Sequence, residues 1–263
     1  MKKVGFIGWR GMVGSVLMQR IEEESNYKDI ESFFFSTSQV GQACPKEYAK
    51  DPILLDASDI YVLSKMDIIL SCQGSDYTKK ILKPLRKSGW NGHWIDAASE
   101  LRMNDDAVIV LDPINQKSIE KAFDKGIKNW VGGNCTVSLM LLAIQGLISE
   151  GVVEWVSSMT YQAASGAGAE NMRELLLQMG QLHSSVEGKL NIKNVNILDL
   201  DKEVQGTINS KNLSTDYFKV PLAGSLIPWI DGDLGDGNSR EEWKGGTETN
   251  KILGSEFNSI NVD

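Results

Sequence analysis

Short apolar segments alternate with helix-like segments along the first half of the chain. Apolar runs of strand length predict strands, and apolar residues at helical spacing predict helices between several of them. The predicted strands cover residues 4–8, 32–35, 66–72, 94–97, 108–111 and 130–131. Helices are predicted over residues 13–23 and 77–87. Strands that alternate with helices and are apolar on both faces form parallel sheets, so this half predicts an α/β fold with helices on both faces of the sheet.

The second half has a different pattern. Residues 155–164 predict one longer strand, and residues 169–190 predict a long helix with apolar residues at i, i+3, i+4 and i+7. Residues 191–214 are polar and only partly strand-like. Ser239 is followed three residues later by Glu242, which predicts a capping box at the start of another helix.

The change of pattern predicts two domains. The parallel-sheet pattern ends near residues 132–136, so we expect one domain over residues 1–133 and an α+β domain over residues 134–263. The last residues, 259–263, have the pattern of the start of a strand. We therefore expect the second domain to be truncated at its carboxyl end.

Composition and charge exclude several classes of protein. The 263 residues carry 27 Lys and Arg against 35 Asp and Glu, a formal net charge of −8, with no basic block that would favour nucleic acid or an anionic membrane. A hydrophobic content of 41% excludes wholesale disorder. The apolar run 139–144 is too short to span a bilayer, and the first residues lack the pattern of a signal peptide. We expect a soluble cytoplasmic protein.

The cysteines predict free thiols. Cys44, Cys72 and Cys135 are an odd number, lie far apart and form no CxxC pair. This usage is typical of a reducing compartment and predicts neither a disulfide framework nor a metal site.

A glycine-rich turn follows the first predicted strand. Gly8, Gly11 and Gly14 stand in GxxGxxG spacing at the start of a helix. Glycines allow a tight turn and a close approach to a pyrophosphate, and the helix supplies free N–H groups. The spacing differs from the usual GxGxxG, so a turn without a ligand is the alternative interpretation.

The second strand ends in hydroxyl side chains. A site for NAD places an acidic residue there to hold the ribose, whereas this chain has the segment 36–38, Ser-Thr-Ser, with Arg10 in the neighbouring loop. These donors suit a 2′-phosphate, so we expect NADP. The alternative is an ordinary polar surface loop.

Cys135 differs from the other cysteines in its setting. It lies between a predicted strand and the apolar helix 137–148, so we expect it at a helix N-terminus, where the dipole favours the thiolate. A thiolate is a nucleophile. A buried small hydrophobic side chain is the alternative, and it is the expected role of Cys44 and Cys72.

Three further features suit a bound ligand: Arg102 and the Glu241–Lys244 pair suit anionic or zwitterionic groups, and the small residues 163–169 can line a cofactor or substrate close to the backbone. Arg102 follows a strand, where ligands of open α/β sheets bind. Glu241 and Lys244 share a helix face, and the small residues 163–169 connect a strand to a helix. The alternatives are a surface arginine, a solvated ion pair and a flexible connection.

Taken together, these segments resemble aspartate-semialdehyde dehydrogenases of the Gram-negative bacterial form. The resemblance extends over essentially the whole chain and is carried by residues 4–14, 35–39, 132–138, 161–166, 220–229 and 240–244. It implies an N-terminal Rossmann-type NADP-binding domain and a catalytic domain that also forms a homodimer interface. It implies NADP-dependent reductive dephosphorylation of 4-phospho-L-aspartate to L-aspartate 4-semialdehyde, in lysine (diaminopimelate), threonine and methionine biosynthesis.

The resemblance also implies a set of cofactor-binding residues. Those expected to hold NADP follow the first, second and third strands: Gly8, Arg10, Gly11, Met12, Val13, Gly14, Thr37, Ser38 and Gln73. A segment of small residues is expected to close on the cofactor: Ser165, Gly166, Ala167, Gly168 and Ala169.

A second set carries the chemistry. By resemblance, Cys135 is the catalytic nucleophile that forms a thioacyl enzyme, and Asn134 orients the substrate. Phosphate is expected to bind Arg102 and Lys244. The substrate is expected to contact Gln162 and Glu241, the latter through its amino group.

The sequence departs from the family pattern in one respect. The family uses an acid/base histidine and a substrate-binding arginine beyond the last residue of this chain, and neither His93 nor His183 stands in that histidine motif. Loss of acid/base assistance typically costs about 10²–10⁴-fold in rate. A truncated, non-catalytic NADP-binding remnant is therefore the alternative function, and an N-acyl-glutamyl-phosphate reductase is a related one that fits the motifs less well.

Overall fold

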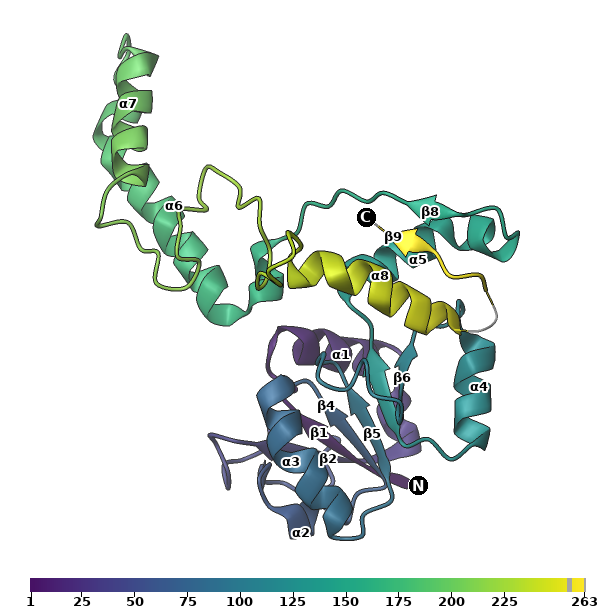
Figure 1. Ribbon diagram of the computed structural model, residues 1–263. Helices are drawn as coiled ribbons and strands as arrows, with labels where there is room; N and C mark the ends of the chain where they lie inside the picture. Colours follow the sequence, from purple (N-terminus) through teal and green to yellow (C-terminus); the bar gives the residue numbers. More distant parts are fainter. Residues whose placement is uncertain (255–256, 263) are drawn as a thin grey trace. The chain divides into compact units, whose positions relative to one another are not determined.

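The computed structural model describes residues 1–254 and 257–262. The chain divides into two compact units (Figure 1). The first comprises residues 1–159 and the described residues from 240 onward, and the second comprises residues 160–239. The predicted boundary between residues 133 and 134 falls inside the first unit and stays a prediction.

A seven-stranded parallel sheet forms the centre of the first unit, which confirms the predicted α/β fold. Its strands are β1 (Lys2–Ile7), β2 (Ile30–Ser36), β3 (Leu55–Asp56), β4 (Ile68–Ser71), β5 (His93–Asp96), β6 (Ala107–Val110) and β7 (Asn129–Gly132). Their order is β3-β2-β1-β4-β5-β7-β6, and every pair is parallel. The chain leaves β1 toward β2 and returns to β4 on its other side. The crevice between β1 and β4 is the place where such sheets bind ligands.

Alternating side chains of the strands pack against helices on opposite faces. Phe6 and Phe34 lie in the core beneath α1 (Met12–Glu23), whereas the next residues, Ile7 and Phe35, pack with α2 (Ile60–Leu63) and α3 (Ser75–Lys87). Because successive side chains of a strand point to opposite faces, this division requires both faces to be covered. The helices predicted over residues 13–23 and 77–87 are confirmed, and a short 3-10 helix, η1 (Asn26–Asp29), precedes β2.

A third apolar cluster joins two helices distant in sequence. In this cluster α5 (Cys135–Ser149) and α8 (Arg240–Leu253) pack together beside β6 and near α4 (Gln116–Asp124). Leu141 and Ile252 are both fully buried there. Through this packing, the first turn of α8 lies beside the turn after β7, where Asn134 and Cys135 are found.

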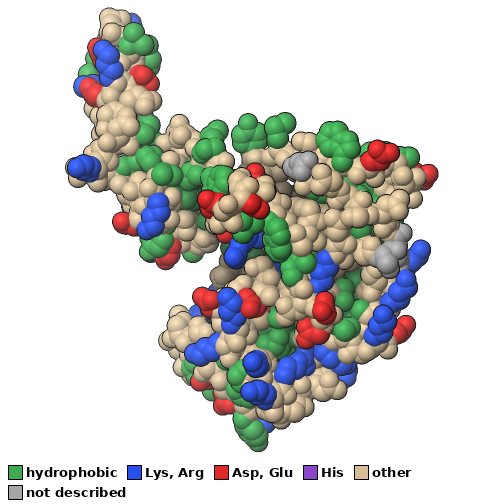
Figure 2. Space-filling view, in the orientation of Figure 1, with side chains coloured by type: hydrophobic (Ala, Val, Ile, Leu, Met, Phe, Trp, Pro, Cys, Tyr) green, Lys and Arg blue, Asp and Glu red, His purple; other side chains and the backbone are tan. Residues whose placement is uncertain are grey.

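The long strand predicted over residues 155–164 is wrong beyond its first two residues. The observed strand β8 (Trp155–Val156) pairs only with β9 (Asn261–Val262), and within the described ranges no further strand extends that ladder. Without a partner strand the following segment stays irregular, and Trp155 and Met159 are exposed. Apolar side chains accordingly lie on the surface over β8 (Figure 2). The predicted start of a strand at residues 259–263 is confirmed at β9, while residue 263 lies outside the described residues.

Two helices and a 3-10 turn are the regular elements of the second unit, and residues 209–239 are irregular. The regular elements are η2 (Ala164–Ala167), α6 (Ala169–Leu190) and α7 (Ile197–Ile208). The prediction of α6 is confirmed with the same bounds, whereas the partly strand-like reading of residues 191–214 is wrong because α7 forms there. Asn196 caps α7, and Leu200 is buried where α7 packs on α6.

Residues 1–254 and 257–262 contain neither a helix that could cross a membrane nor a cluster that could hold a metal ion. None of the helices there combines the length and apolarity needed to cross a membrane. The same part of the chain contains no group of three or more His, Cys, Asp or Glu arranged to hold a metal ion.

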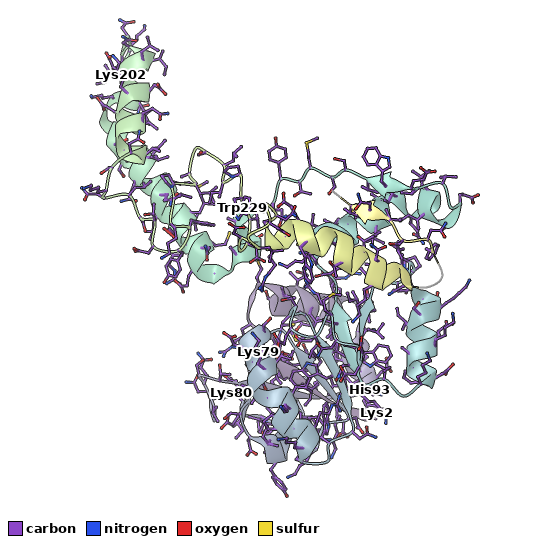
Figure 3. All side chains as sticks on the ribbon, viewed as in Figure 1. Lys2, Lys79, Lys80, His93, Lys202 and Trp229 are labelled. Carbon is purple, nitrogen blue, oxygen red and sulfur yellow. The ribbon has the colours of Figure 1, made fainter. Side chains whose placement is uncertain are left out.

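His93 lies at the amino end of β5, the opposite end of the sheet from the ligand-binding edge. Figure 3 labels it together with Lys2, from the start of β1. Trp130 Nε1 donates to its Nδ1 at 2.9 Å, and Phe123 stacks on its ring. Burial, followed by the charge of Lys128, lowers the pKa of His93 below 6.5. These contacts give His93 a structural role at the end of the sheet opposite the ligand-binding edge.

Acidification should therefore destabilise the first unit through His93. The folded state holds the proton less tightly than the unfolded chain, so stability is lost as the pH falls below about 6.5. His93→Asn keeps an acceptor for Trp130 but cannot be protonated. We expect a smaller fall of the melting temperature between pH 7 and pH 5 in this variant, with the exposed His183→Asn as the matched control. Equal falls in all three proteins would contradict the assignment.

The turn after β1 should tolerate no side chain at Gly14. An added Cβ there would lie 2.6 Å from Trp9 Cα and still closer to the carbonyl oxygen of Gly8. Gly14→Ala is expected to lower the free energy of unfolding by about 1–3 kcal/mol. Gly146→Ala, in α5 with open space around its Cβ, should instead raise it by about 0.5–1 kcal/mol. Urea denaturation measures both, and equal effects would contradict the crowding at Gly14.

Candidate active site

The turn between β1 and α1 is built on close backbone approaches. Gly8 has φ +70°, and a Cβ there would lie 2.5 Å from the carbonyl carbon of Cys72 and 2.7 Å from the nitrogen of Gln73. The ends of β1 and β4 therefore meet here, which brings Gln73 to the glycine turn. Met12 and Val13 are exposed in the first turn of α1. Such a turn, with a helix start beside it, is able to cradle a pyrophosphate.

The end of β2 holds Arg10 beside this turn. Arg10 Nη2 donates to Ser36 Oγ at 3.0 Å, and the same oxygen accepts from the backbone N–H groups of Ser38 at 3.3 Å and Gln39 at 3.0 Å. Ser36 is buried, whereas Thr37 and Ser38 are exposed. A cation and exposed hydroxyls thus gather at one point. The sequence interpretation used Ser36 only as part of a polar segment and missed its organising contacts.

Cys135 is exposed as the first residue of α5, the place predicted for it. Asn134 is the N-cap, and its side chain accepts from the N–H groups of Thr136 at 2.9 Å and Val137 at 3.1 Å. The cap fixes the turn that presents the thiol.

The other two cysteines are in different surroundings. Cys44 is partly buried and packs against the cluster under α1. Burial raises the pKa of the Cys72 thiol to about 11, so this thiol stays protonated at neutral pH. Cys135 is the one exposed thiol among the three.

The first turn of α8 contacts the Cys135 turn. Glu241 Oε1 accepts from Asn134 Nδ2 at 3.0 Å and from Thr136 Oγ1 at 3.3 Å. Its other oxygen accepts from Lys244 Nζ at 3.1 Å, and both side chains of this ion pair are only 15% exposed. The pair is therefore not a solvated surface ion pair, and Glu241 binds the residues on either side of Cys135.

Arg102 joins the same cluster from the loop after β5. Its Nε donates to the carbonyl oxygen of Gly132 at 2.8 Å, and its Nη1 donates to Glu248 Oε1 at 3.0 Å. Glu248 Oε2 accepts from the backbone N–H of Asn134 at 2.8 Å. The sequence interpretation missed Glu248, although it follows Glu241 by two turns of α8 and so lies on the same helix face.

The predicted residues of the second unit lie at the start of α6. Gly168 is its N-cap at φ +101°. The predicted cofactor segment covers the last three residues of η2, this cap and the first residue of the helix: Ser165, Gly166, Ala167, Gly168 and Ala169. Gln162 precedes that turn. Their roles toward the residues of the first unit stay predictions.

Comparison with known proteins identifies the family. Residues 3–122 match the semialdehyde dehydrogenase NAD-binding domain, and residues 144–262 match the semialdehyde dehydrogenase dimerisation domain. The chain is 49% identical to an aspartate semialdehyde dehydrogenase from Francisella tularensis, with a TM-score of 0.92, over 100% of this chain and 71% of that one. The chain belongs to the aspartate-semialdehyde dehydrogenase family.

More distant members share the fold. Aspartate semialdehyde dehydrogenase II from Vibrio cholerae, solved in complex with ASA, is 22% identical with a TM-score of 0.74 over 100% of this chain and 68% of that one. The enzyme from Candida albicans, solved with NADP, is 16% identical with a TM-score of 0.56 over 100% and 66%. Membership of the aspartate-semialdehyde dehydrogenase family makes the chain an oxidoreductase with a Rossmann-type NAD(P)-binding domain.

Removal of the Asn134 cap should destabilise α5 in this family member. Asn134→Ala loses both the cap and the bond to Glu241, whereas Asn134→Ser loses only the latter because serine is also a good N-cap. We expect the alanine variant to be less stable than the serine variant by about 1 kcal/mol, measured by urea denaturation. Equal stabilities would mean that the cap does not hold this turn.

Proposed function

We propose that this chain carries out the NADP-dependent, phosphorylating reaction of aspartate-semialdehyde dehydrogenases through a thioacyl intermediate on Cys135. The observation that carries the proposal is the setting of this thiol. It is exposed at a capped helix N-terminus. Two cations are linked to the same turn by hydrogen bonds, Arg102 through the carboxylate of Glu248 and Lys244 through that of Glu241. The substrate in the biosynthetic direction is 4-phospho-L-aspartate, and the product is L-aspartate 4-semialdehyde.

The residues at the crevice between β1 and β4 fit NADP. The missing side chains at Gly8 and Gly14 leave the backbone turn tight enough for a pyrophosphate. Arg10 and the exposed hydroxyls of Thr37 and Ser38 suit a 2′-phosphate. Asp56 is paired with Ser36 on the neighbouring strand β3, and its carboxylate is already engaged by hydrogen bonds from the backbone N–H and the hydroxyl of Ser58. When bound, NADPH supplies the hydride that reduces the thioester.

The protein's own chemistry centres on Cys135. Its thiolate attacks the acyl carbon of 4-phospho-L-aspartate, a C–S bond forms, and the bond to the phosphate oxygen breaks. Arg102 and Lys244 offset the charge of the departing phosphate. By the family resemblance, Asn134 orients the substrate, Gln162 contacts it, and Glu241 binds its amino group. After reduction, the thiolate leaves as the aldehyde forms.

The match to a dimerisation domain supports a homodimer as the functional form. The reaction belongs to the biosynthesis of lysine (through diaminopimelate), threonine and methionine. Cytoplasmic localisation stays a prediction.

The proposed function is tested by reduction of NADP with aspartate semialdehyde. The rate should depend on inorganic phosphate and should fall at least about 10³-fold in Cys135→Ala, because that variant has no nucleophile. Cys44→Ala is the matched control and should retain activity. NADP binding without turnover in the folded wild type would contradict the proposal and would support the non-catalytic alternative.

NADP selectivity should depend on Arg10. A charge-assisted bond to phosphate contributes about 1.5–3 kcal/mol, so Arg10→Ala should weaken NADP binding by roughly 10–100-fold. NAD binding should change little, because NAD lacks the 2′-phosphate. Fluorescence titration with both nucleotides measures this, and Arg20→Ala on the exposed face of α1 is the matched control. An equal loss for both nucleotides would contradict the assignment of Arg10.

A further inference from the structure

Glu248 is a buried carboxylate with two different functional partners. Its residue is 2% exposed in the middle of α8, between the polar first turn and the apolar end. One oxygen accepts from the Arg102 guanidinium at 3.0 Å, and the other accepts from the N–H of Asn134 at 2.8 Å. The side chain thus bridges a cation assigned to phosphate and the residue that precedes the nucleophile.

The contacts of Arg102 fix the direction of its guanidinium group. Nε is held by the Gly132 carbonyl and Nη1 by Glu248, so one edge of the plane is anchored to protein. Among the described residues, Nη2 has no hydrogen-bond partner. Because the guanidinium is planar and rigid, anchoring one edge orients the remaining donors.

The contact to Asn134 fixes the other side of the cluster. The N–H of Asn134 lies just before α5, and the side chain of the same residue caps that helix. Glu248 therefore fixes the backbone N–H of Asn134, while the Asn134 side chain fixes the N–H groups of Thr136 and Val137. Cys135 follows Asn134 directly.

We infer that Glu248 is a positioning residue that aligns the phosphate-binding edge of Arg102 with the Cys135 turn. This inference rests on the proposed function, in which phosphate binds at Arg102. Glu248 acts through Arg102 and Asn134, and it is not assigned a contact with the substrate.

Only a carboxylate satisfies both contacts. Both partners of Glu248 donate, so both of its oxygens must accept. In Glu248→Gln, the amide nitrogen faces one of two donors, and one contact is lost. Loss of the negative charge alone would tighten phosphate binding, whereas loss of alignment would weaken it. The sign of the change therefore separates positioning from a simple charge effect.

The test measures inorganic phosphate binding and steady-state kinetics on the full chain. Isothermal titration calorimetry with inorganic phosphate, in the presence of NADP, should give an increase of about tenfold in Kd for Glu248→Gln. The phosphate KM should rise in parallel, while the KM values for the semialdehyde and NADP stay within about twofold of wild type. Glu150→Gln, exposed at the end of α5, is the matched control and should behave as wild type.

The outcomes separate this inference from the proposed function. An unchanged or lower phosphate Kd in folded Glu248→Gln would overturn the inference, as would absence of phosphate binding by the wild type. Phosphate binding without turnover in the wild type would contradict only the proposed function, and the calorimetric comparison would still decide the role of Glu248. Should Glu248→Gln fail to fold, Glu248→Asp, which keeps two acceptors with a shorter reach, is judged by the same change in phosphate Kd. An increase supports positioning, and no increase overturns it.

Discussion

The common direction of the seven strands is the constraint on which the site depends. Parallel strands end at the same edge of a sheet, so the segments after β1, β2, β4, β5 and β7 are brought together there although they are far apart in sequence. The glycine turn follows β1, Arg102 follows β5, and Cys135 follows β7. The turn that suits a nucleotide and the exposed thiol therefore belong to one edge of one sheet. Their separation along the chain is a consequence of the crossovers that parallel pairing requires.

Helix α8 completes the site at the same edge, and carboxylates make the connections. Glu241 binds the side chain of Asn134 and Lys244, and Glu248 binds Arg102 and the backbone of Asn134. The apolar half of α8 packs against α5 through Ile252 and Leu253. One helix thus presents an ionic half to the functional turn and an apolar half to the core. Because a buried carboxylate is stable only when its oxygens are bonded, the positions of Arg102 and Asn134 are coupled to the packing of α8.

The strand and helix pattern of the first half could be predicted from sequence because local periodicity and tertiary burial agree there. The position of Cys135 followed from a strand, two glycines and an apolar helix. Other features depend on contacts that no local pattern contains. The strand at Trp155 pairs with β9 through two residues of the described ranges, and α7 is stabilised by packing on α6. Glu248 was missed because a glutamate in an amphipathic helix is ordinarily exposed, and its burial depends on Arg102, 146 residues away.

In the proposed reaction Cys135 carries the acyl group, and mass spectrometry of the acid-quenched protein detects that group. The protein is mixed with aspartate semialdehyde and NADP without phosphate and then digested. We expect one aspartyl acyl group on the peptide that contains Cys135, dependent on NADP and removed when phosphate is added before quenching. Absence of any adduct under these conditions, or an adduct on Cys44 or Cys72 in place of Cys135, would contradict the role of Cys135 as the nucleophile.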